Sequence, residues 1–134
     1  QMGLFFKTHY PDAHIAVNDI GAVSFLSECR VLDIWGLGSL AVLNEKRNGA
    51  LSVETLRRLA DKDSVRVAAL YSWIEVPREW TVAGTWRSDK KILCCGDRVS
   101  FYAVAPGALP LLREHLADFT ARLPASTTFE SSIP

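Results

Sequence analysis

The sequence lacks an excess of charge of either sign, because its 15 lysine and arginine residues balance its 15 aspartate and glutamate residues. Without a basic excess there is no electrostatic footprint for nucleic acid, which is therefore not an expected partner. No apolar run approaches the roughly 20 residues that span a bilayer, and no basic segment followed by an apolar one marks a signal peptide. What remains to be explained is a small globular domain.

Cysteine is scarce, and its spacing matches no common site. Cys29, Cys94 and Cys95 form neither a disulfide framework nor a zinc-binding C-x-x-C pattern. We expect a buried free thiol at Cys29, and a bridge to Cys94 or Cys95 in an oxidising compartment is the alternative. The three histidines are scattered, and no serine lies in a G-x-S-x-G turn. We therefore expect no metal ion, no cofactor and no hydrolytic triad.

The composition is that of one folded domain. Hydrophobic residues make up 49% of the 134 positions and charged residues 22%, which favours a globular chain over a disordered one. A chain of this length buries a core without disulfides, so residues 1–134 are interpreted as a single soluble α/β domain. The chain starts at Gln1, and its first ten residues already have the pattern of an apolar helix. We therefore expect a domain excised from a larger protein.

Hydrophobic periodicity predicts an alternation of helices and strands. The expected helices cover residues 2–9, 20–27, 40–45, 53–62 and 109–123. The expected strands cover residues 15–18, 31–34, 65–71, 80–86, 92–94 and 99–104. The helix over 109–123 is amphipathic and ends at Pro124, and the tail after it, ASTTFESSIP, is expected to be loose.

This order predicts an α/β fold, a layered sandwich around a mixed sheet. The first three strands are separated by helices, so they are expected to be parallel and joined by right-handed crossovers. The later strands are joined by short turns, which suit antiparallel neighbours. The C-terminal amphipathic helix then packs on this sheet.

Polar residues follow the first two predicted strands. Asn18 and Asp19 come after the first strand, and Asp33 lies in the second. Because the carboxyl ends of parallel strands share one edge, Asp19 and Asp33 are expected to line one crevice. Paired carboxylates there suit acid–base catalysis, sugar hydroxyls or a cation. The structural alternative is that Asp19 caps a helix, Asn18 bonds turn backbone and Asp33 accepts nearby N–H groups.

Glycine and tryptophan complete the candidate site. Gly21 does not belong to a G-x-G-x-x-G dinucleotide fingerprint, and is expected to permit close packing of a helix on a strand. Trp35 precedes the turn at Gly36, where its ring suits stacking on a sugar; packing in the core is the alternative. No catalytic residue or metal ligand is assigned. The candidate binding residues are Asn18, Asp19, Gly21, Asp33, Trp35 and Gly36.

The stretch VNDIGAVSFLSECRVLDIWGL resembles a segment in the C-terminal soluble region of bacterial polytopic membrane glycosyltransferases of the GT-C type. Residues 18–21 match an N-D-x-G turn after a strand, and residues 33–37 match an aspartate, two residues, then Gly-Leu. In that family the catalytic aspartate lies in an extracytoplasmic loop of the membrane half. The resemblance therefore assigns no catalytic role to Asp19 or Asp33.

The resemblance implies an accessory domain on the periplasmic, extracytoplasmic face of the inner membrane. Its implied partners are the membrane-embedded remainder of the same chain and a glycan or polyprenyl-phosphate sugar, which the domain helps to bind or position. Two other functions stay open on the residues alone. One is a small independent α/β enzyme with Asp19 and Asp33 as its acid–base pair, and the other is a protein-interaction domain.

Overall fold

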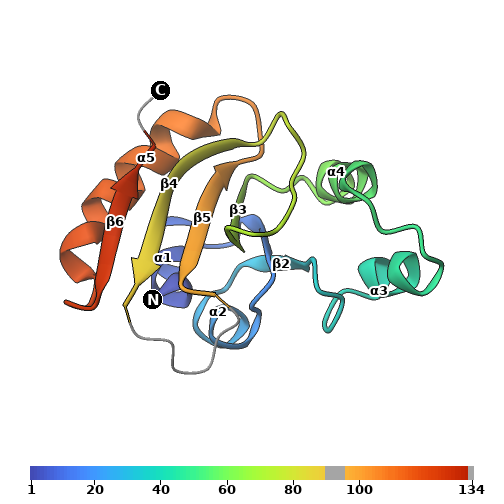
Figure 1. The fold of residues 1–134 in the computed structure, drawn as a ribbon, viewed down its shortest axis with the longest axis horizontal. Coiled ribbons are helices and arrows are strands. Elements are labelled where there is room, and N and C mark those ends of the chain that lie inside the picture. Colours follow the sequence, from blue (N-terminus) through green and yellow to red (C-terminus); the bar gives the residue numbers. More distant parts are fainter. Residues whose placement is uncertain (90–95, 133–134) are drawn as a thin grey trace.

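A six-stranded mixed sheet carries helices on both of its faces (Figure 1) in the computed structural model, which describes residues 1–89 and 96–132. The helices are α1 (Met2–His9), α2 (Gly21–Leu26), α3 (Leu40–Arg47), α4 (Val53–Lys62) and α5 (Ala108–Phe119), which continues into the 3₁₀ turn η1 (Thr120–Arg122). The strands are β1 (His14–Val17), β2 (Arg30–Asp33), β3 (Val67–Tyr71), β4 (Thr81–Ser88), β5 (Arg98–Ala103) and β6 (Thr127–Ser131).

The sheet has the order β2-β1-β3-β5-β4-β6, and its two halves differ in direction. β1 pairs in parallel with both β2 and β3, whereas β5, β4 and β6 join in antiparallel pairs. The mixed α/β sandwich predicted from the sequence is therefore confirmed. The chain runs from β1 to β2 on one side and returns to β3 on the other side of β1. Crevices for ligands form at the carboxyl ends of strands where such a reversal occurs.

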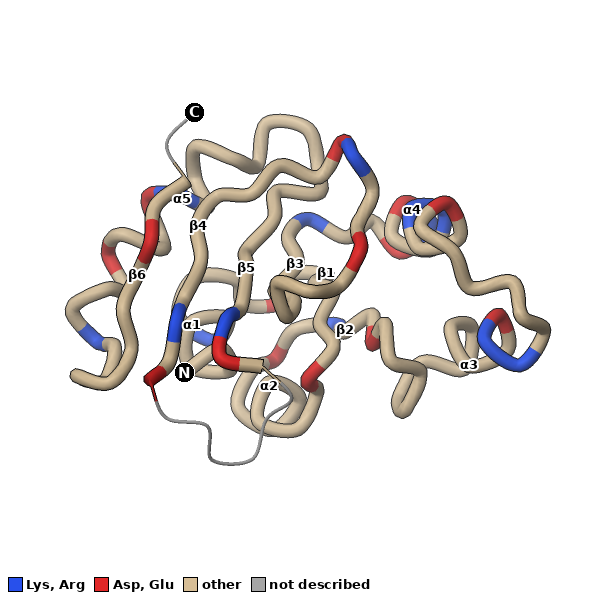
Figure 2. Tube along the Cα trace, viewed as in Figure 1, with Lys and Arg blue, Asp and Glu red and all other residues tan. Residues whose placement is uncertain are grey.

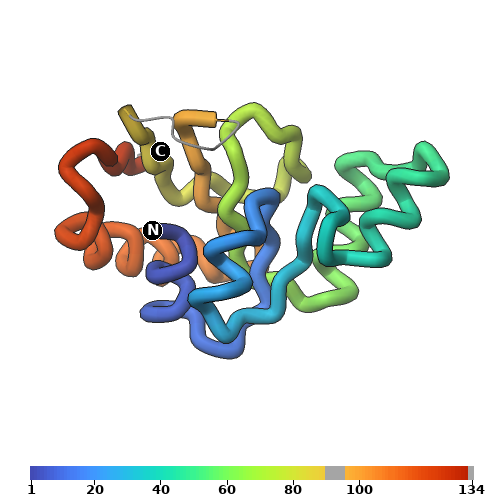
Figure 3. The backbone as a smooth tube through the Cα atoms, turned by 90° about the horizontal axis from the view of Figure 1, so that it is seen from below, coloured from blue at the N-terminus to red at the C-terminus, as the bar shows by residue number. Residues whose placement is uncertain are grey.

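The two faces of the sheet have separate cores, which makes the sandwich three-layered. Alternate residues of a strand point to opposite faces, so Ile15 and Val17 of β1 pack in one core and Ala16 packs in the other. The first core is covered by α1, α2 and α5, and the second by α3 and α4. In Figure 3 the dark-blue α1 and the orange α5 lie side by side.

Aromatic rings fill the first core. Phe5 of α1 is fully buried, and its ring centroid lies 5.5 Å from that of Trp86, 5.2 Å from Phe101 and 5.5 Å from Phe119. All three contacts are edge-to-face, the arrangement that the ring quadrupole favours. The N-terminal helix is therefore an integral part of the fold.

The prediction of a loose C-terminal tail is wrong. Residues of the tail form β6, which pairs with β4 and sets Phe129 opposite Trp86. The Phe129 ring packs where Gly84 has no side chain, since a β-carbon there would lie within 3.0 Å of Phe129 Cζ. This fit joins positions 45 residues apart (129 minus 84), so a local pattern does not reveal it.

Two other expectations fall partly outside the described residues. The strand expected over 92–94 lies there, and so do Cys94 and Cys95, the alternative disulfide partners. Cys29 is described, and its thiol donates a hydrogen bond to the Tyr10 carbonyl oxygen at 3.1 Å. Across residues 1–89 and 96–132, none of the helices combines the length and the apolar character that crossing a bilayer requires.

Candidate functional site

The carboxyl ends of the three parallel strands meet at one edge of the sheet. Val17 of β1 lies opposite Asp33 of β2 and Ala69 of β3. The segments that follow these strands therefore start side by side, as expected for a parallel sheet. They hold the polar and aromatic residues described next.

Asn18 and Asp19 tie the end of β1 to the end of β3. The side-chain oxygen Oδ1 of Asn18 accepts a hydrogen bond from the Tyr71 backbone N–H at 2.9 Å. The carboxylate oxygen Oδ2 of Asp19 accepts one from the Tyr71 hydroxyl, also at 2.9 Å. Asp19 does not cap α2, because the residue at that position is Ile20 and the helix has no side-chain cap. The predicted cap is thus wrong, and Asp19 bonds across the sheet instead.

Asp33 organises the turn that follows β2. Its side chain is 1% exposed, and its two carboxylate oxygens accept hydrogen bonds from the backbone N–H groups of Trp35 at 2.8 Å and Gly38 at 2.7 Å. The Asp33 backbone N–H donates to the Ser39 hydroxyl at 2.9 Å. A buried carboxylate bonded in this way fixes a loop, which is the structural alternative expected for Asp33.

The two candidate glycines have different roles. Gly36 has a φ of 82°, a left-handed conformation that favours glycine, and it is buried against the backbone of Leu43 in α3. Gly21 was expected to allow close packing of a helix on a strand, but a β-carbon there would meet nothing within 4 Å. That interpretation of Gly21 is wrong, since its position opens α2 on the exposed side.

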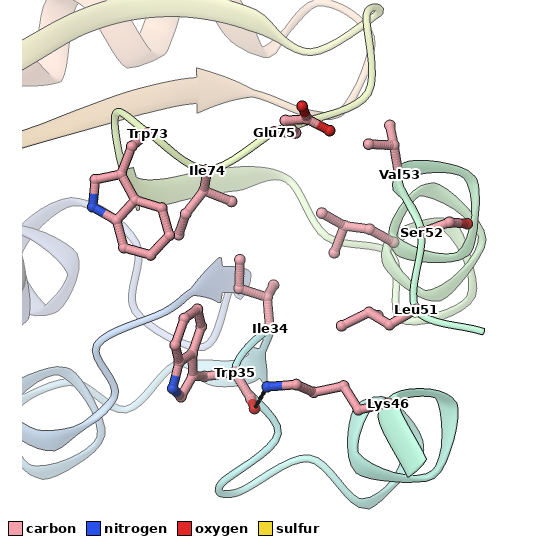
Figure 4. A pocket seen from close by; sticks show the side chains of 10 residues that line it. Ile34, Trp35, Lys46, Leu51, Ser52, Val53, Trp73, Ile74 and Glu75 are labelled. Carbon is pink, nitrogen blue, oxygen red and sulfur yellow. Dashed lines mark hydrogen bonds between the residues drawn. The ribbon is translucent and has the colours of Figure 1, made fainter. Parts of the chain in front are cut away.

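Two half-exposed tryptophans lie at this edge of the sheet, in the turns that follow β2 and β3. Trp35 is 43% exposed and Trp73 is 55% exposed, and their rings meet edge-to-face with centroids 5.9 Å apart. Trp73 also stacks on Tyr71, with centroids 6.1 Å apart and ring planes 20° apart. Trp35 comes from the turn after β2 and Trp73 from the turn after β3 (Figure 4). The fold thus brings together two rings that are 38 positions apart (73 minus 35).

Lys46 of α3 holds Trp35 in place. Its ammonium group donates a hydrogen bond to the Trp35 carbonyl oxygen at 2.9 Å and lies 4.7 Å from the centroid of the Trp35 ring. The second distance is within the range of a cation–π contact. Together with the hydrogen bond that the Trp35 backbone N–H donates to the Asp33 carboxylate, this contact fixes both the backbone and the ring of Trp35 before any ligand arrives.

The two tryptophans border a pocket of about 400 Å³, here called the aromatic pocket. It lies between the strand ends and the helices α3 and α4 (Figure 4), and it is lined by Ile34, Trp35, Lys46, Leu51, Ser52, Val53, Leu56, Trp73, Ile74 and Glu75. Its walls are mainly aliphatic and aromatic, with an ammonium, a hydroxyl and a carboxylate as polar groups. This volume and this lining are typical of small-ligand sites.

A second pocket of about 290 Å³ lies on the other side of the same edge. Asp19, Tyr71, Trp86 and Asp97 are among its lining residues, whereas Asp33 lines neither pocket. The structure therefore divides the candidate residues predicted from the sequence. Trp35 enters the aromatic pocket, Asp19 enters the second pocket, and Asp33 belongs to the scaffold between them.

Sequence reasoning found Trp35 but left out the rest of the aromatic pocket. Trp73 had a detectable signal, since it lies two residues after a predicted strand, at the edge that was already selected for Asp33. Lys46 and Glu75 had none, because a loop and a helix bring them to the pocket from distant positions. Their roles depend on tertiary structure.

The two pockets are lined by groups that suit the binding of a ligand. Among the described residues, neither lining includes a histidine or a cysteine. Within residues 1–89 and 96–132, no group of three or more acidic, histidine or cysteine side chains is arranged to hold a metal ion. What the aromatic pocket offers is two aromatic rings, an aliphatic wall and two opposite charges, Lys46 and Glu75.

Residues 1–102 match a protein family described as a domain of unknown function (DUF8728), and the chain belongs to that family. All the residues that line the aromatic pocket lie within the matched segment, whereas α5 and β6 follow it. No curated protein and no solved structure matches the chain.

Proposed function

We propose that this domain binds a carbohydrate in the aromatic pocket and that it positions this ligand without transforming it. The observation that carries the proposal is the pair formed by Trp35 and Trp73, two half-exposed rings at the border of a ligand-sized pocket. Each half-exposed indole ring leaves a large apolar area in contact with water, and a neighbouring pair of such rings marks a surface that a partner covers.

The chemistry of the pocket fits a sugar. The C–H face of a pyranose ring is apolar and packs on an indole, while its hydroxyls need hydrogen-bonding groups at the rim. Lys46 supplies donors and Glu75 supplies acceptors, from opposite sides of the pocket (Figure 4). The aliphatic residues Leu51, Val53 and Ile74 offer a surface for an apolar continuation of the ligand, such as the lipid of a lipid-linked sugar.

The setting that we propose is the extracytoplasmic face of a membrane, beside the membrane-embedded remainder of a glycosyltransferase-like chain. Its support is the resemblance of residues 18–37 to the soluble region of GT-C enzymes. A parent reading frame that encodes several hydrophobic spans before residue 1 is the expected result. A reading frame without such spans would contradict this setting and leave carbohydrate binding to be judged by itself.

An accessory role agrees with the state of the carboxylates. An enzyme with Asp19 and Asp33 as acid and base needs both in one cleft, about 5–10 Å apart. Asp33 is buried with both oxygens bonded to backbone N–H groups, and Asp19 lines a pocket that Asp33 does not reach. These contacts favour the binding function over the acid–base enzyme.

The test is a titration of the domain with mono- and oligosaccharides, followed through tryptophan emission. We expect a saturable change in emission. Trp35→Ala and Trp73→Ala should each lower the affinity for the sugar by about tenfold or more, which is a loss of about 1.4 kcal/mol of binding free energy. Phe25→Ala is the matched control, since Phe25 is an exposed aromatic residue of α2 that does not line the aromatic pocket. Absence of a response to every sugar would favour the protein-interaction domain.

A further inference from the structure

The turn after β2 exposes several large apolar side chains to solvent. Within residues 35–40, here called the apolar loop, Leu37 is 76% exposed and Leu40 is 69% exposed, and Trp35 stands beside them. A single exposed leucine is ordinary in a soluble protein. Here no charged residue occurs between Asp33 and Glu45, so the exposed leucines belong to a continuous uncharged stretch.

Several backbone polar groups of the apolar loop are bonded inside the protein. The N–H groups of Trp35 and Gly38 donate to the Asp33 carboxylate, and that of Gly36 donates to the Asp33 carbonyl oxygen at 3.2 Å. The carbonyl oxygen of Trp35 accepts from Lys46. A loop in water does not need such bonds, since water satisfies its backbone. A loop that enters an apolar medium does need them, because each unpaired group costs several kcal/mol there.

The helix that follows the apolar loop ends with two basic residues. Lys46 and Arg47 end α3, the helix that follows the loop, and they are seen as the blue segment of α3 in Figure 2. The acidic neighbour Glu45 is paired with Arg58 at 2.6 Å, which offsets its charge. Glu75 lies across the pocket from Lys46 (Figure 4). The Lys46 ammonium thus lies at the apolar loop, in contact with Trp35, and Arg47 follows it at the end of α3.

We infer that the apolar loop docks on a lipid bilayer with anionic headgroups. Leu37 and Leu40 enter the boundary between headgroups and acyl chains, and Trp35 lies at headgroup level, where indole rings are enriched. Lys46 and Arg47 meet the anionic headgroups. The combination of uncharged side chains, bonded backbone and flanking cations suits a fluid anionic surface. This inference shares Trp35 and Lys46 with the proposed sugar site, but it rests on Leu37 and Leu40, which do not line the aromatic pocket.

The inference is tested by co-sedimentation of the domain with lipid vesicles. We expect binding to vesicles of phosphatidylcholine with about one third phosphatidylglycerol, weaker binding to phosphatidylcholine alone, and a loss of binding as salt is raised. Changing both leucines, Leu37→Ser with Leu40→Ser, is expected to lower the partition coefficient by about tenfold or more, since two large apolar side chains then no longer leave water. The matched control is Leu4→Ser with Leu111→Ser, which changes two exposed leucines of α1 and α5.

A second measurement does not depend on how the variants fold. Phosphatidylcholine brominated near the headgroup end of its acyl chains should quench part of the tryptophan emission of the unmodified domain. Absence of binding to anionic vesicles, equal losses in both double variants, or binding without quenching would overturn the inference. A change of oligomeric state in the Leu37/Leu40 variant with unchanged vesicle binding would also overturn it, and would identify the surface as an interface between copies of the chain.

Discussion

Removing the Asp33 carboxylate tests whether this residue builds the loop that carries Trp35. Asp33→Ala removes a buried carboxylate and leaves the backbone N–H groups of Trp35 and Gly38, in a partly buried turn, without their acceptors. A hydrogen bond to a charged group is worth about 1.5–3 kcal/mol, so the loss of two predicts about 3 kcal/mol or more of unfolding free energy. Asp33→Asn keeps one acceptor oxygen and should lose about half as much. Since domains are stable by about 5–15 kcal/mol, the alanine variant approaches the limit of folding.

The assay is urea unfolding followed by far-ultraviolet circular dichroism, with the midpoint and slope fitted separately. Asp19→Asn is the matched control, because Asp19 lies at the same edge and accepts a hydrogen bond from the Tyr71 hydroxyl, which an amide oxygen also accepts. It should cost less than about 1 kcal/mol. If Asp33→Ala unfolds within about 0.5 kcal/mol of the unmodified domain, or if Asp19→Asn costs as much, the scaffold role of Asp33 is refuted.

Three other predictions concern the rest of the fold. Gly84→Ala should destabilise the domain by about 1–3 kcal/mol in urea unfolding, because its methyl group meets the ring of Phe129, and the cost should shrink in a Phe129→Ala background; equal costs in both backgrounds would disprove the contact. Burial lowers the pKa of His9, with a smaller contribution from the nearby His115, so the unfolded chain binds this proton more readily. The unfolding free energy should therefore fall as pH drops below about 6.5, and a His9→Gln variant that shows the same slope would contradict this origin. Ser52→Ala removes the cap of α4 and should cost about 1 kcal/mol, whereas Ser52→Asp should retain most of the stability; equal losses would speak against capping.

The order of elements was predictable because each burst of apolar residues is local. The strand predicted over 65–71 contains β3, whose five residues 67–71 are all buried, and the helix predicted over 53–62 is α4. β6 was missed because its sequence, TTFES, has one large apolar residue and alternates weakly. Its pairing depends on the space at Gly84, which becomes visible only when β4 and β6 lie together.

The edge that carries the site was predictable, but the roles of its residues were not. The strand-end rule identified Asn18, Asp19 and Asp33 as neighbours at one edge. It did not show that Asp19 accepts a hydrogen bond from the Tyr71 hydroxyl instead of capping α2, since that bond joins residues 52 positions apart. For the same reason the approach of Trp73 to Trp35, which makes the pocket, follows from the pairing of β1 with β2 and β3 and not from any local motif.

The most direct test of carbohydrate binding is a two-dimensional ¹H–¹⁵N spectrum of the domain, in which the indole N–H groups give one signal for each of the four tryptophans. Trp35 and Trp73 border the aromatic pocket, whereas Trp80 and Trp86 are buried in the two cores. On titration with a bound oligosaccharide, we expect the signals of Trp35 and Trp73 to move together and saturate while that of Trp80 stays in place. Movement of the Trp86 signal alone would indicate that the sugar binds in the second pocket, which Trp86 lines. If all four signals stay in place with every sugar, the carbohydrate-binding function is contradicted.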